Sequence, residues 1–74
     1  MEMEKEYDNL NELVKALSPY INQSALARIC DINEGQMRQY ISGVRNPSLQ
    51  TIEKINIAIE KFSDKLKETR IKIE

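Results

Sequence analysis

Two short helical patterns separated by a three-residue turn lie within residues 23–47, and they limit the folds open to this chain more than any other feature. Apolar side chains recur at helical spacing on both sides of the turn. Those expected to face inward are Leu26, Ala27, Cys30, Met37, Tyr40, Ile41 and Val44. Asn33 is a favourable N-cap, and Gly43 follows the second pattern. The sequence therefore predicts helices at about 23–30 and 34–42 that meet at a steep angle.

Two more helices are predicted around this pair. Asp8 is the expected N-cap of a first helix, whose apolar stripe is Leu10, Leu13, Val14 and Leu17. Ser18-Pro19 should end it, because proline disfavours a helical residue before it. After Ser48, residues 49 to about 67 form a long pattern without glycine or proline. We expect an all-α domain of four to five helices over residues 8–68. Its most buried residues should include Leu26, Ala27, Met37, Tyr40, Ile52 and Ile55.

The long helix carries a heptad-like apolar seam. Its members, spaced 3, 4, 3 and 4 residues apart, are Ile52, Ile55, Ile59, Phe62 and Leu66. The first part of the seam should cover the core, which is small in a chain of 74 residues. The distal part is either more core or a dimer interface. In the second case, the interface residues would be Ile59, Phe62, Leu66, Ile71 and Ile73.

Charge is distributed unevenly between the two ends. Residues 1–12 carry five acidic residues and one lysine, whereas residues 13–74 carry ten basic and seven acidic residues. A phosphate backbone feels the local distribution of charge and not the net charge, so the acidic leader, residues 1–7, does not argue against nucleic-acid binding by the rest of the chain. The alternative is that the leader is only a solubilising segment. The tail, residues 69–74, alternates apolar or Thr side chains with charged ones, as a strand does. Such a strand would need a partner, either the leader or a second subunit.

Composition argues against several functional classes. The chain has one cysteine and no histidine, which excludes an intrachain disulfide and most zinc sites. Cys30 is expected to be a buried thiol. No phosphate-binding loop or paired-carboxylate site is evident, so we expect neither an enzyme nor a cofactor or metal. Without a long apolar run or a signal peptide, the sequence predicts a soluble cytoplasmic protein that does not enter a membrane.

The two central helices resemble the helix-turn-helix of the Cro/repressor-type (lambda-repressor-like, XRE) DNA-binding family. The resemblance covers roughly residues 9–60. It is carried by Gln23, Ala27, Ile32, Met37, Tyr40, Ser42-Gly43 and the link Val44-Arg45-Asn46-Pro47-Ser48-Leu49. Asp31 stands where the family usually has glycine, and Asp tolerates the left-handed conformation that such a turn needs. The family also commonly breaks the last helix with a glycine, which this chain lacks.

The resemblance implies that the helix 34–42 reads the major groove of double-stranded DNA. The residues expected to contact bases are Glu34, Gly35, Gln36, Arg38, Gln39 and Ser42. Those expected to contact phosphates are Asn22, Gln23, Arg45 and Asn46. Without such a frame, the same polar face would be an ordinary solvated surface, and Glu34 would simply complement the helix dipole.

The resemblance favours a sequence-specific transcriptional regulator of bacterial or phage type, a repressor or autoregulator that binds a palindromic operator as a homodimer. The alternative is a helix-turn-helix-derived module that binds a protein partner, such as an antitoxin-like or adapter subunit. The long apolar seam and the weak net charge of −1 favour this alternative more than usual.

Overall fold

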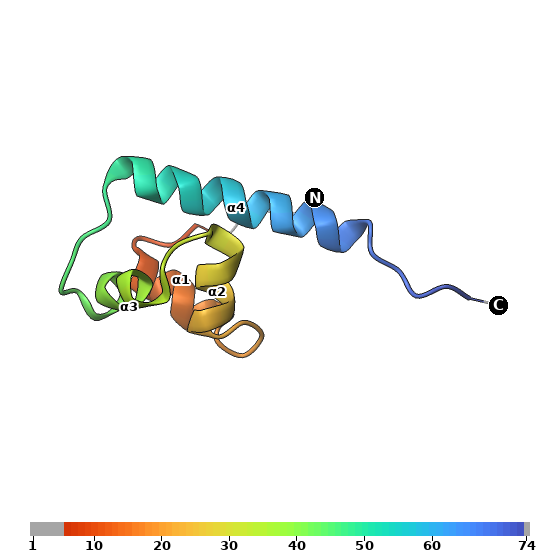
Figure 1. The fold of residues 1–74 in the computed structure, drawn as a ribbon, viewed down its shortest axis with the longest axis horizontal. Coiled ribbons are helices and arrows are strands. Elements are labelled where there is room, and N and C mark those ends of the chain that lie inside the picture. Colours follow the sequence, from red (N-terminus) through yellow and green to blue (C-terminus); the bar gives the residue numbers. More distant parts are fainter. Residues whose placement is uncertain (1–5, 74) are drawn as a thin grey trace.

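The computed structural model describes residues 6–73 and shows four helices and no strand in that range (Figure 1). In chain order, they are α1 (Leu10–Leu17), α2 (Gln23–Cys30), α3 (Glu34–Ser42) and α4 (Leu49–Lys67). The fold class is therefore all-α, as expected. The bounds of α2, α3 and α4 coincide with the ranges predicted from the sequence. Within the described range, no helix is both long enough and apolar enough to cross a membrane.

Each helix begins with a short polar side chain that accepts a hydrogen bond from a backbone N–H three residues further on. These N-caps are Asn9, Asn22, Asn33 and Ser48. The prediction of Asp8 as the first cap was wrong. Asn9 Oδ1 accepts from the Glu12 N–H at 2.9 Å, so α1 begins one residue later than a cap at Asp8 requires.

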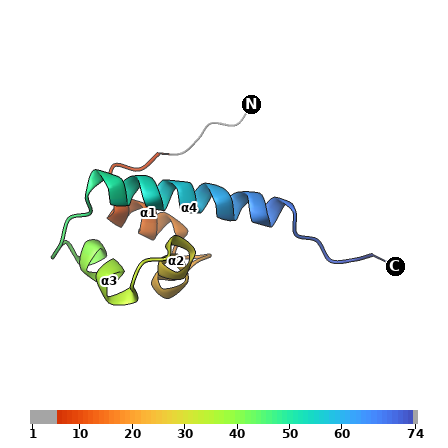
Figure 2. The ribbon, with the colours of Figure 1, turned by 45° about the horizontal axis from the view of Figure 1, so that its top comes forward.

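The core is formed by side chains from all four helices. α2 packs against α3 and α4, and α1 packs against α3 (Figure 2). The buried cluster consists of Val14, Leu26, Ala27, Cys30, Met37 and Ile55, and Tyr40 is also buried. Burial raises the pKa of the Cys30 thiol, although the charge of Lys54 opposes the shift. The thiol therefore behaves as a small apolar side chain of the core.

Two residues that were expected to face inward are exposed. Val44 is 78% exposed, because α3 ends at Ser42 and Gly43 takes a left-handed backbone conformation with φ 85°. The chain therefore leaves the helical face before Val44 is reached. Ile52 is 42% exposed, because α4 reaches the core only at Ile55, which is 3% exposed. The first turn of α4 directly follows the loop that leads from α3 and precedes the part of the helix that packs on the core (Figure 1).

The second half of α4 continues past the small core (Figure 1). Ile59 packs against the core and Phe62 is half-buried, whereas Leu66 is 55% exposed. Beyond α4, the tail forms neither a helix nor a strand over residues 69–73. Ile71 and Ile73 are 91% and 92% exposed. The distal part of α4 and the tail thus present apolar residues that the described part of one chain does not cover.

The packing of α2 against its neighbouring helices can be tested at Ala27, because this residue of α2 is almost completely buried. We expect Ala27→Leu to lower the free energy of unfolding by ~1–3 kcal/mol, because the added side chain must displace packed neighbours. Ala25→Leu, at a half-buried position of the same helix, is the control and should cost less. Urea unfolding followed by circular dichroism measures both. Equal stability of Ala27→Leu and the natural protein would contradict this packing.

Candidate nucleic-acid interface

The turn between α2 and α3 fixes how α3 is presented. Asp31 is left-handed, with φ 56° and ψ 46°. Its N–H donates to the Arg28 carbonyl at 3.2 Å, and the N–H of Ile32 donates to the Ala27 carbonyl at 2.9 Å. This pair of bonds is the Schellman motif, which usually has glycine at the left-handed position. Ile32 then packs against the core.

Asn33 begins α3 immediately after this turn. Its Oδ1 accepts from the Gln36 N–H at 3.1 Å. A helix N-cap of this kind contributes about 1 kcal/mol to stability. Each of the three residues between the two helices thus makes a hydrogen bond that belongs to the Schellman motif or to the N-cap.

Two longer-range hydrogen bonds brace α3 from outside the turn. Asn11 of α1 donates through Nδ2 to the Ile41 carbonyl at 2.8 Å, near the end of α3. Lys54 of α4 donates through Nζ to the Asp31 carbonyl at 3.1 Å. α1 and α2 therefore contact α3 directly, whereas α4 holds the turn that precedes it.

The outward face of α3 is polar, as the helical pattern predicted. Met37 and Tyr40 are buried on one side, whereas Arg38, Gln39 and Ser42 are exposed on the other. The side chain of Gln39 makes no hydrogen bond to any described residue, and Ser42 Oγ donates to the Gln39 carbonyl at 3.2 Å. Gln39 therefore presents a side-chain amide with both its donor and its acceptor available, which is what two hydrogen bonds to adenine require.

Glu34 is held by two neighbours at the start of α3. Ser24 Oγ of α2 donates to Glu34 Oε1 at 2.8 Å, and Arg38 Nη2 lies 3.9 Å from the same oxygen. The ion pair with Arg38 is exposed and contributes little stability. The bond from Ser24 gives Glu34 a structural role in joining α2 to α3, besides its place in the first turn of the helix.

Gln36 lies partly towards the core. Its Nε2 donates to the Tyr40 hydroxyl at 2.8 Å, and the residue is half-buried. This bond satisfies the hydroxyl of a buried tyrosine, as buried polar groups require. Gln36, expected to contact bases, is therefore less available for that role than Gln39.

The N-cap of α3 gives a structural reason for a glycine at position 35, besides any close approach to DNA. A Cβ at this position would lie 3.1 Å from Asn33 Oδ1, the atom that caps α3. Such a contact is tighter than van der Waals packing allows without a shift of the Asn33 side chain. Glycine therefore lowers intrinsic helix propensity by up to ~1 kcal/mol but keeps the cap in place.

The four residues expected to contact phosphates are all exposed and lie at the edges of the two helices. Asn22 caps α2, where its Oδ1 accepts from the Ala25 N–H at 2.8 Å, and Gln23 is the first residue of that helix. Arg45 and Asn46 lie in the loop after α3. The N–H of Arg45 donates to the Gln39 carbonyl at 3.2 Å, which ties this loop to the outward face of α3.

Ser24 was not identified from the sequence, although the structure places its hydroxyl against the first turn of α3. The available signal was that a serine one residue after Gln23 shares the exposed end of α2 with two predicted contact residues. Among residues 6–73, no group of three metal-binding side chains occurs. Comparisons with protein-family models, curated proteins and solved structures find no match.

The bond between Gln36 and Tyr40 can be tested by a double-mutant cycle. We expect Gln36→Ala and Tyr40→Phe each to cost ~0.5–1.5 kcal/mol of stability, because each removes the same hydrogen bond. The double variant should then cost clearly less than the sum. Gln39→Ala makes the same change of helix propensity without losing a side-chain bond, and should stay within ~0.5 kcal/mol. Additive costs in urea unfolding would contradict the bond.

Proposed function

We propose that the chain is a sequence-specific DNA-binding transcriptional regulator of the lambda-repressor-like type, and that α3 enters the major groove. The observation that carries the proposal is the outward face of α3, where Arg38, Gln39 and Ser42 are exposed on a helix that α1 and α2 contact and whose preceding turn α4 holds. Arg and Gln side chains can each make paired hydrogen bonds to the major-groove edge of one base. A braced helix offers these groups in a fixed register.

The arrangement of cationic and polar groups supports the same proposal. Asn22 and Gln23 lie at the N-terminus of α2, where backbone N–H groups and the helix dipole favour a phosphate. Arg45 lies in the exposed loop beyond the last turn of α3, where its N–H donates to the Gln39 carbonyl. Contacts at both edges would fix the position of the helix on the duplex, while base contacts would supply specificity.

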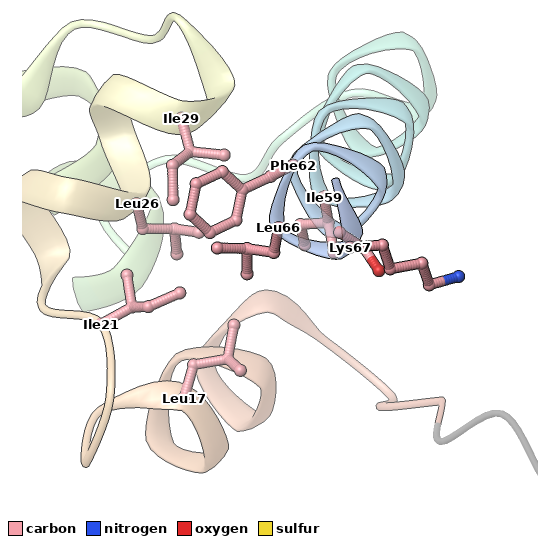
Figure 3. Close-up of a pocket in the computed structure, with 9 residues that line it drawn as sticks. Leu17, Ile21, Leu26, Ile29, Ile59, Phe62, Leu66 and Lys67 are labelled. Carbon is pink, nitrogen blue, oxygen red and sulfur yellow. The ribbon is translucent and has the colours of Figure 1, made fainter. Parts of the chain in front are cut away.

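The proposed regulator acts as a homodimer. An apolar groove of about 370 Å³, which we call the distal groove, runs between the second half of α4 and a wall formed by α1, α2 and the loop that joins them (Figure 3). Its apolar side chains are Leu17, Ile21, Leu26, Ile29, Ile59, Phe62 and Leu66. Single chains leave this surface open, and a second α4 would cover it. Dimerisation would also place two copies of α3 on one side of the duplex, which requires a separation near 34–36 Å and a palindromic operator.

The same groove favours one alternative, namely a module that binds a different protein. An amphipathic helix of a partner could occupy the distal groove by inserting side chains at helical spacing. In that case α3 would keep its place in the fold but would not bind DNA, and the chain would resemble an antitoxin-like or adapter subunit. DNA binding and its dependence on salt distinguish the two functions.

Two substitutions should give different signatures in one titration series. We expect Gln39→Ala to relax base preference by ~1–3 kcal/mol at one position of each half-site, because it removes a direct contact to a base edge. Arg45→Ala should weaken all duplexes alike and make the salt dependence shallower, because phosphates carry no sequence information. Fluorescence anisotropy with duplexes selected from a random pool, at two salt concentrations, measures both.

Gln36→Ala is the matched control for Gln39→Ala, because it alters the same residue type on the same helix but at a side chain bonded to Tyr40. It should change base preference less than Gln39→Ala does, because its side-chain amide is already bonded. If no duplex binds even at low salt, the protein-binding alternative replaces this proposal.

The dimer is tested best at Leu66, because its side chain is more than half exposed and its replacement spares the core. We expect Leu66→Glu to give folded monomers in sedimentation experiments, since two buried carboxylates would oppose association. Phe62→Glu should do the same but also destabilise the fold, because Phe62 lines the groove beside Leu26. A natural protein that is monomeric at high micromolar concentration would show that the seam only completes the core.

A further inference from the structure

A second groove lies on the other flank of α4, between this helix and the segment that precedes α1. This leader groove has a volume of about 760 Å³. Apolar side chains that line it are Leu10, Leu13, Ile52, Ile55, Ile57 and Ile59. Its charged lining is mainly acidic, with Glu6, Asp8, Glu60 and Asp64 against Lys67 alone. The leader groove therefore suits an occupant that is apolar on one side and positively charged on the other.

The tail of the chain has this character. Residues 69–73 form neither helix nor strand. When such a segment binds in an extended conformation, successive side chains point in opposite directions, so that Ile71 and Ile73 share one side and Arg70 and Lys72 share the other. All four are exposed. Arg70 Nη1 donates only to the carbonyl of Thr69, at 3.0 Å, so the described residues offer its guanidinium no carboxylate.

The tail of one chain points away from its own leader groove. It leaves the end of α4 and continues away from the other helices (Figures 1 and 2). The exit is held by Thr69, whose N–H donates to the Leu66 carbonyl at 3.2 Å and whose Oγ1 donates to the Lys65 carbonyl at 2.7 Å. Residues 65–73 contain no glycine, asparagine or proline, the residues that favour a tight reversal.

We propose that the leader groove binds the tail of a second copy of this chain, so that two copies exchange tails. Ile71 and Ile73 enter the apolar floor, and Arg70 and Lys72 meet the acidic rim at Glu60 and Asp64. The exchange is reciprocal, because each copy supplies one tail and one groove. Its closed two-fold arrangement uses both grooves and both tails.

The length of the tail agrees with the length of the part of α4 that lines the leader groove. Five extended residues span roughly 16 Å, and the ten-residue step from Ile52 to Phe62 along α4 is roughly 15 Å. The groove lining follows α4 from Ile52 to Lys67, and Ile52 and Ile57 are exposed along it. The inference deepens the proposed homodimer and does not depend on DNA reading.

Charge reversal provides a direct test, because the groove and the tail can be altered separately. The groove variant is Glu60→Lys/Asp64→Lys, and the tail variant is Arg70→Glu/Lys72→Glu. We expect each alone to weaken self-association at least tenfold, because like charges then meet. An equimolar mixture of the two variants should recover the association as heterodimers, since each tail again faces a groove of opposite charge. Native mass spectrometry and sedimentation equilibrium at low salt, without DNA, measure this.

Two controls separate this exchange from other effects. Glu12→Lys/Glu53→Lys changes the net charge as the groove variant does, but at exposed residues outside the groove lining, and should leave association unchanged. Ile71→Ala/Ile73→Ala should weaken association without any change of charge. Circular dichroism checks that each variant folds.

Three results would overturn the proposal. The natural protein could be monomeric, the reversed variants could associate as the natural protein does, or their mixture could fail to form heterodimers. The last result would also follow if each tail bound its own groove. The association measurements contain no DNA, so their outcome does not depend on whether the chain binds a duplex. The tail exchange and the DNA-binding proposal can therefore fail separately.

Discussion

The left-handed residue Asp31 and the two hydrogen bonds around it determine the direction in which α3 leaves α2. The turn brings Ile32 into the core and places Asn33 where it caps the next helix. Lys54 then binds the Asp31 carbonyl from α4, which connects the most distant helix in the sequence to the turn. A change of backbone conformation at Asp31 would break the Schellman motif and move the whole outward face of α3.

Burial and exposure are divided sharply along α3. Met37 has no exposed surface and Tyr40 is buried, so the inward face is fully used by packing. The outward side chains at Arg38 and Gln39 are consequently free of any packing role, and their chemistry can serve recognition. α4 has a similar division along its length. Its first half packs on α2 and holds the turn, whereas its second half and the tail present the apolar surface on which association is proposed.

The elements were predictable because their signals are local. Asn33 and Ser48 mark helix starts, Ser42-Gly43 marks a helix end, and apolar spacing identifies Leu26, Ala27 and Met37 as core residues. One error was local, since the adjacent residues Asp8 and Asn9 are both good N-caps and Asn9 is the one used. The other errors came from the arrangement of the helices, which local patterns do not contain.

Val44 continues the apolar spacing of α3 but follows the left-handed Gly43. Ile52 belongs to the seam of α4 but lies before the point at which that helix meets the core. The structural roles of Ser24 and Gln36 depend on which side chains of other turns and helices come within 2.8 Å, which spacing along the chain does not reveal. The tail has the alternation of a strand, but a strand also needs a neighbour, and the described part of one chain provides none.

The most direct test of the account is to select duplexes from a random pool with the ¹⁵N-labelled protein and then to map the bound duplex by backbone amide chemical shifts. The account predicts an enriched palindromic site, with the largest shift changes on the outer residues of α3 and at the start of α2. Failure to enrich any sequence, or shift changes confined to the distal half of α4, would contradict it.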